Sequence, residues 1–92
     1  MNNNEGGYLL VNVRYANSAL PIDQATIEVT DGINTRRYET GENGKSENII
    51  LNVGNNNSVV IRANNFLEKR IDNIPIRKGF VSIQNVEMFP AI

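Results

Sequence analysis

The side chains that could do chemistry in this 92-residue chain are carboxylates, lysines and serines, because the sequence contains no histidine and no cysteine. Lacking both, the chain has no disulfide, no thiolate nucleophile, few possible zinc ligands and not the usual general base. No nucleophile-elbow motif surrounds any of the candidate nucleophiles Ser18, Ser46, Ser58 and Ser82. We therefore expect no serine-based catalysis.

A metal site is the next candidate, because residues 39–47, ETGENGKSE, superficially match an acidic calcium loop. Such a loop needs oxygen ligands at alternating positions and a terminal bidentate carboxylate. Gly41 and Lys45 interrupt that series among the candidate ligands Glu39, Glu42, Asn43 and Glu47. A plain turn is the favoured interpretation, and we expect no metal and no cofactor.

The remaining catalytic options need a pocket. A lysine base requires a depressed pKa, and Lys45, Lys69 and Lys78 all lie beside turns or other charges. A carboxylate pair could hydrolyse a glycoside only within a cleft of suitable size, for which a short domain has little material. We expect a protein without enzymatic activity.

Two short stretches suit binding, since each places basic residues beside an aromatic ring, a combination enriched at interface hot spots. They are Arg36, Arg37 and Tyr38 in one strand, and Arg77, Lys78 and Phe80 in a turn. The alternative is that these charges keep an exposed strand edge soluble and unpaired. We predict other protein subunits as partners, with oligomerisation through strand edges as a further possibility.

Charge and hydropathy argue against other partners. Nine basic and ten acidic residues nearly cancel, so no basic footprint for nucleic acid is evident. No run approaches the roughly 20 apolar residues that a membrane span needs. The start, MNNNEGG, has neither the basic nor the apolar region of a secretory signal. We expect synthesis in the cytoplasm and no membrane partner.

Asparagine and isoleucine are abundant, with asparagine runs at residues 2–4 and 55–57. The second run could bind glycans, but both residues have AT-rich codons, and a low-GC genome explains their enrichment without selection on the protein. The codon explanation is favoured.

Apolar residues alternate along the chain with the period of a β-strand. In YLLVNVRY, residues 8–15, Leu9, Val11 and Val13 share one face, and Leu10 lies on the other. No window has a convincing helical period. Turn signals separate seven predicted strands, at residues 8–15, 25–30, 34–40, 46–53, 58–63, 66–76 and 81–89. This spacing predicts a β-sandwich over residues 7–90, preceded by a flexible tail of residues 1–6.

In a regular strand over residues 81–89, Val81 and Ile83 would lie on one face and Val86 and Met88 on the other. A β-bulge near Gln84 and Asn85 would restore the facing. The predicted core consists of Val11, Val13, Ile27, Val29, Val59, Ile61, Ile83 and Met88.

The order of these features resembles the carboxypeptidase-regulatory-like domain, a transthyretin-like (prealbumin-like) sandwich. The similarity lies in GYLLVNV, LPIDQATIEV, YETGENGKSENIIL, VVIRANNF and the closing IDNIPIRKGFVSIQNVEMFP, over roughly residues 6–90. Asn65 and Phe66 stand where the family usually has Gly-Tyr, so asparagine must take that turn. The resemblance implies an all-β, seven-stranded antiparallel Greek-key sandwich.

The resemblance is greatest to the versions of the domain in low-GC Gram-positive bacteria and their phages, and it permits two settings. The first is a small component of a phage tail, baseplate or contractile bacteriocin particle, which would place the chain in a virion or phage-tail-like particle. This first setting is favoured because no secretory signal, catalytic group or linker is evident. The alternative is an accessory domain of the cell envelope, associated with peptidoglycan hydrolases or with spore or surface proteins, that binds protein or glycan. It would apply if the chain is a fragment of a secreted protein.

Overall fold

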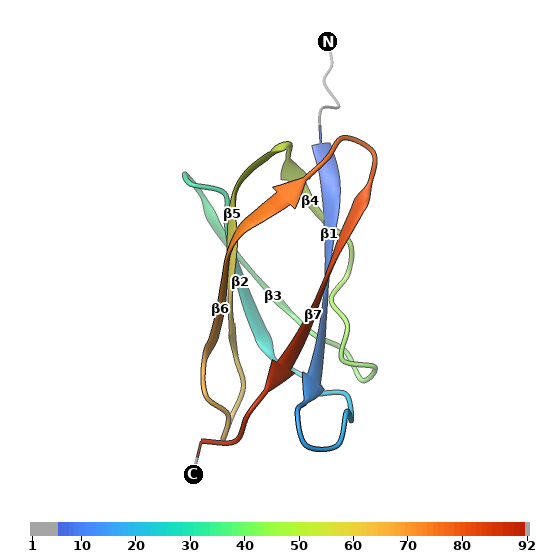
Figure 1. Cartoon of the computed structure of the whole chain (residues 1–92), viewed down its shortest axis with the longest axis vertical. Helices are drawn as coiled ribbons and strands as arrows, with labels where there is room; N and C mark the ends of the chain where they lie inside the picture. Colours follow the sequence, from blue (N-terminus) through green and yellow to red (C-terminus); the bar gives the residue numbers. More distant parts are fainter. Residues whose placement is uncertain (1–5, 92) are drawn as a thin grey trace.

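The computed structural model describes residues 6–91, which form seven strands and no helix (Figure 1). The strands are β1 (Gly6–Tyr15), β2 (Thr26–Thr30), β3 (Thr35–Glu39), β4 (Ile49–Asn52), β5 (Gly54–Arg62), β6 (Lys69–Ile76) and β7 (Val81–Met88). The predicted all-β class is confirmed. Gly6 was expected in the tail but begins β1, and the rest of the predicted tail lies outside the described residues.

The strands form two sheets that face each other as a sandwich (Figure 1). One sheet has the order β4-β1-β7 and the other the order β3-β2-β5-β6. Neighbouring strands are antiparallel except β1 and β7, which run parallel from the pair Tyr8 and Val81 to the pair Tyr15 and Met88. The expectation of a wholly antiparallel sandwich is therefore wrong at this pair, where the first and last strands lie side by side.

Most strand boundaries differ from the sequence prediction by one to four residues, and the largest shift is at the start of β5. β5 begins at Gly54, so the asparagine run predicted as a loop belongs to the strand. Asn57 is buried there, and its amide donates to the carbonyls of Gly54 and Ile74 at a register irregularity between β5 and β6. The side-chain amide of Asn57 is therefore used within the fold and is not available to bind a glycan. β6 begins at Lys69 rather than at Phe66.

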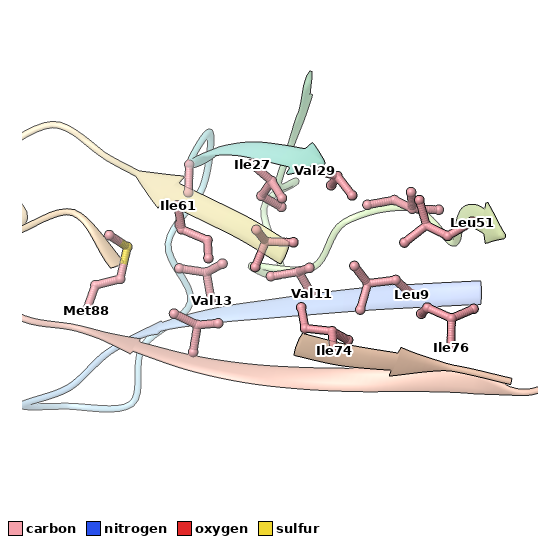
Figure 2. Close-up of a cluster of buried hydrophobic side chains, with 14 residues drawn as sticks. Leu9, Val11, Val13, Ile27, Val29, Leu51, Ile61, Ile74, Ile76 and Met88 are labelled. Atoms are coloured by element: carbon pink, nitrogen blue, oxygen red, sulfur yellow. The ribbon is translucent and has the colours of Figure 1, made fainter. Parts of the chain in front are cut away.

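The core is a single cluster of aliphatic side chains and one methionine between the two sheets (Figure 2). Seven of the eight predicted core residues belong to it, and the exception is Ile83, which is 56% exposed. The β1–β7 register runs without a shift through Gln84 and Asn85, so the predicted bulge is absent. β7 instead turns Val86 and Met88 inward and leaves Val81 and Ile83 on the outer face.

The connection from β3 to β4 crosses from one sheet to the other, so the turn predicted within residues 39–47 belongs to an inter-sheet link and not to a hairpin. Gly44 has a φ of 78°, and a Cβ there would lie 2.5 Å from the Val13 carbonyl oxygen, so only glycine fits. The next residues follow β1, where Ser46 N–H donates to the carbonyl of Val11 and its hydroxyl accepts from Val11 N–H.

Candidate interaction surface

The predicted binding residues of β3 divide between the two faces of their strand. β3 is an edge strand, as expected. Arg36 and Tyr38 pair in register with the buried Val29 and Ile27, so they lie on the core side. Arg36 donates to the Ile50 carbonyl at 2.7 Å and its guanidinium lies 6.0 Å from the Tyr38 ring centroid. Both residues thus close the rim between the two sheets.

The second predicted group lies in the turn that joins β6 to β7. Gly79 takes a φ of 76°, and Phe80 N–H donates to the Arg77 carbonyl. The Phe80 side chain is 65% exposed, and its carbonyl accepts from Tyr8 N–H in β1. The turn, which also holds Lys78, therefore adjoins one end of the three-stranded sheet, whereas β3 is the edge of the other sheet. The two predicted groups therefore belong to different sheets.

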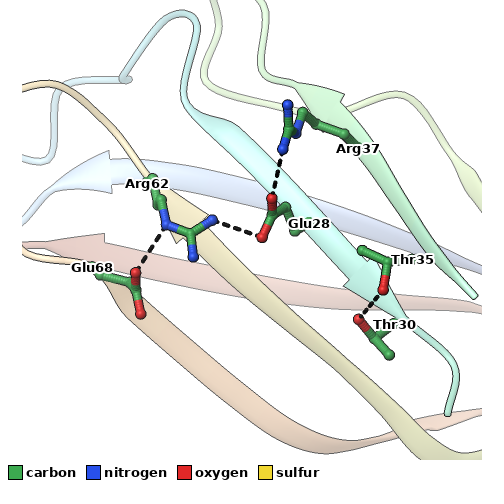
Figure 3. Close-up of polar contacts among 6 residues, drawn as sticks. All are labelled: Glu28, Thr30, Thr35, Arg37, Arg62 and Glu68. Atoms are coloured by element: carbon green, nitrogen blue, oxygen red, sulfur yellow. Dashed lines mark hydrogen bonds and ion pairs between the residues drawn. The ribbon is translucent and has the colours of Figure 1, made fainter.

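The outer face of the four-stranded sheet carries a chain of ion pairs (Figure 3). Glu28 accepts from Arg37 at 2.8 Å and from Arg62 at 2.6 Å, and Arg62 also pairs with Glu68 at 2.9 Å. Hydrogen bonds from Arg62 and then Arg37 lower the pKa of Glu28, and the carboxylates raise the pKa of Arg62. This face is largely polar, and four of its charged residues form one chain of ion pairs.

The outer face of the three-stranded sheet is different. Its side chains form cross-strand rows, because residues in register on neighbouring strands point to the same side. The first row holds Ile50, Tyr8 and Val81, and the second holds Leu10 and Ile83. Of these, Ile50, Val81 and Ile83 are 61%, 46% and 56% exposed.

Two polar rows follow along the same face. Asn12 pairs in register with Asn85, and its amide donates to the Asn85 side-chain oxygen at 3.1 Å. Arg14 then pairs in register with Glu87. We call these four rows together the outer apolar face. The name refers to the first two rows, whose exposed apolar residues distinguish this face from the outer face of the other sheet.

Sequence reasoning missed the outer apolar face because it placed Ile83 in the core with Met88 and explained their opposite parity by a bulge. The change of parity in VSIQNVEM was the available signal. A bulge is one explanation of this pattern. The other is a regular strand with Val81 and Ile83 on one side and Val86 and Met88 on the other, so that both sides carry apolar residues.

The remaining candidates for a site are a surface hollow and the acidic side chains. A shallow hollow of about 440 Å³ is lined in part by Asp23, Gln24, Arg62 and Asn64, but Arg62 is already paired with Glu28 and Glu68. Between Gly6 and Ala91 no cluster of acidic side chains could hold a metal ion. The same part of the chain contains no helix long and apolar enough to cross a membrane.

Comparison with known proteins identifies the fold but not a family. No family model matches the chain, and no curated protein sequence matches it. Among solved structures, the Bacillus anthracis TIE protein is similar, with a TM-score of 0.71 and 12% sequence identity over 95% of this chain. The aligned region covers 17% of the TIE protein chain. At this identity the match supports a shared sandwich fold and nothing about function.

Proposed function

We propose that the chain is a non-enzymatic binding module that joins a larger protein assembly through the outer apolar face. The observation that carries this proposal is the contrast between its two outer faces. One has its charges paired from Arg37 through Glu28 and Arg62 to Glu68. The other exposes the apolar rows that contain Ile50 and Ile83 to solvent.

Contiguous apolar surface is unfavourable in water, at about 25 cal/mol per Å², and on soluble proteins it commonly marks an interaction site. A β-sheet that meets solvent on one side normally alternates apolar and polar residues, with the polar residues outward. The four-stranded sheet follows this rule, and the first two rows of the three-stranded sheet break it. A protein partner would remove those rows from water.

The polar groups support a binding role over a catalytic one. The described serines have no histidine to activate them, and Arg37, Arg62 and Arg70 of the four-stranded sheet are paired with carboxylates. Arg77, Lys78 and Phe80 adjoin the outer apolar face and are proposed as its rim, while Arg36, Arg37 and Tyr38 have structural contacts of their own.

The transthyretin-like topology and the setting in a phage tail, baseplate or bacteriocin particle belong to the same proposal. The cell-envelope setting is its alternative. The similarity to the TIE protein concerns the fold alone, so it favours neither setting.

The test is affinity capture from extracts of the source organism with two matched isoleucine variants. Ile83→Lys places a charge in the outer apolar face, and Ile33→Lys changes an isoleucine that is 88% exposed in the β2–β3 turn. We expect Ile83→Lys to lose the partner and Ile33→Lys to keep it. Equal capture by both variants, with both folded by circular dichroism, would contradict the proposal.

A further inference from the structure

The rows of the outer apolar face are arranged so that the face matches a second copy of itself. β1 and β7 are parallel neighbours in continuous register. Each row therefore joins one β1 residue to one β7 residue at the same height along the sheet. The rows run from Tyr8 with Val81, through Leu10 with Ile83 and Asn12 with Asn85, to Arg14 with Glu87. In this order the first two rows are apolar, the third pairs two amides, and the fourth pairs a cation with an anion.

A two-fold axis that runs along the strands, between β1 and β7 and just above the face, preserves the height of every row and exchanges the two strands. It places β1 of one copy over β7 of the other. Tyr8 and Leu10 then meet Val81 and Ile83, Asn12 meets Asn85, and Arg14 meets Glu87. Two sheets packed in this way keep their strands within about 30° of each other, which is the usual angle for aligned sheets.

A two-fold axis that lies parallel to the face but perpendicular to the strands is less suitable, because it reverses the order of the rows. Centred on the face, it would set the row of Arg14 and Glu87 over the row of Tyr8 and Val81, and so bury charges against apolar groups. Chemical matching of all four rows selects the axis along the strands.

We infer that a second copy of this chain occupies the outer apolar face, with Arg14 of each copy paired with Glu87 of the other. Within one copy, no ion pair joins Arg14 to Glu87 among residues 6–91, and Arg14 Nη1 donates to the Ala19 carbonyl at 3.2 Å. Both charges retain capacity for a partner, since a guanidinium carries five donors and a carboxylate accepts about four hydrogen bonds. The inference rests on the proposed binding role of this face.

The area of the face sets the strength of this association. Because the axis lies between β1 and β7, only these two strands overlap in the dimer. Two strands about 4.8 Å apart and eight residues of about 3.3 Å each give about 250 Å² per copy. A stable dimer typically buries about 800 Å² per partner. The dimer should therefore be weak and concentration-dependent, and it would gain strength where an assembly holds many copies close together.

The experiment is sedimentation velocity on the full chain, over a concentration series that reaches the millimolar range at low salt. The wild type should move from monomer to dimer as the concentration rises. Arg14→Glu alone sets two carboxylates together across the interface, and Glu87→Arg alone sets two guanidinium groups together. Each single variant should therefore dimerise about tenfold more weakly. An equimolar mixture of the two restores both opposite-charge contacts, but only between unlike copies, and should recover dimerisation.

Ile83→Lys should abolish the dimer, and its matched control Ile33→Lys should not. A wild type that stays monomeric throughout the series overturns the inference, as does a mixture that associates no better than its components or equal effects of the two lysine variants. Failure of the inference is distinguishable from failure of the proposed function. A monomeric chain that still captures a partner, and loses it with Ile83→Lys, keeps the binding role and rejects the dimer.

Discussion

Thr40 shows how a single side chain joins the start of the β3–β4 connection to the end of the β1–β2 connection. It is only 3% exposed, and its hydroxyl accepts from Ala25 N–H at 2.9 Å while donating to the Ile22 carbonyl at 2.7 Å. Its own N–H donates to the Ala25 carbonyl, and its carbonyl accepts from Gln24 N–H. Ala25 is fully buried at this junction, where a crossing segment approaches closely, and this agrees with the small side chain at that position.

Thr40→Val should therefore destabilise the fold more than its small change in shape suggests. Valine fills the same volume but leaves the buried Ala25 N–H without this acceptor, at a cost of about 1–3 kcal/mol. Urea denaturation measures the change. The matched control is Thr35→Val, because the Thr35 hydroxyl contacts Thr30 on an exposed face and its loss should alter the unfolding free energy by under about 1 kcal/mol. Equal losses in the two variants would contradict this role for Thr40.

At the scale of elements, the sequence was informative wherever a strand is buried on one side only. Period-two alternation correctly assigned the inward residues of β1, β2 and β5, such as Val11, Ile27 and Ile61. The turn at Asn65 was also predictable, because asparagine tolerates the left-handed region and its φ is 72°. The edge position of β3 followed from its polar composition.

β7 was not predictable by the same reasoning. Alternation identifies a buried face only when the other face is polar, and β7 carries Val81 and Ile83 on its outer side. The parallel pairing with β1 was equally hidden, because the partners lie at opposite ends of the sequence and no turn connects them. For the same reason the sequence could not show that the interaction residues predicted for β3 and those of the turn at residues 77–80 belong to different sheets, since local composition does not specify which sheet a strand joins.

A pair of alanine substitutions checks this assignment of faces. Ile61 is fully buried and Ile83 is 56% exposed. Ile61→Ala should lower the unfolding free energy by about 2–5 kcal/mol, a large share of the roughly 5–15 kcal/mol typical of a domain. Ile83→Ala should lower it by under about 1 kcal/mol at concentrations where the chain is monomeric. Thermal or urea unfolding of both variants decides, and comparable losses would mean that Ile83 is a core residue after all.

At the scale of the whole molecule, we expect the parallel contact between β1 and β7 to determine the force that is needed to unfold the sandwich by pulling. The two strands lie side by side and point the same way (Figure 1). Force along them in opposite directions loads all rows of the ladder together. Force that separates their neighbouring ends breaks the rows one after another. A component of an assembly that transmits tension would benefit from the first geometry.

This difference is measurable by single-molecule pulling, because the chain has no native cysteine and engineered thiols give unique attachment points. Tyr8→Cys with Glu87→Cys attaches handles at opposite ends of the β1–β7 ladder and loads it in shear. Tyr8→Cys with Val81→Cys attaches them at neighbouring ends, in the same row, and peels it. Tyr8 and Val81 are 37% and 46% exposed and Glu87 is exposed, so the substitutions should preserve the fold. We expect a several-fold higher unfolding force in shear, since many hydrogen bonds must then break at once. Equal forces in the two geometries would show that the β1–β7 ladder is not the element that resists extension.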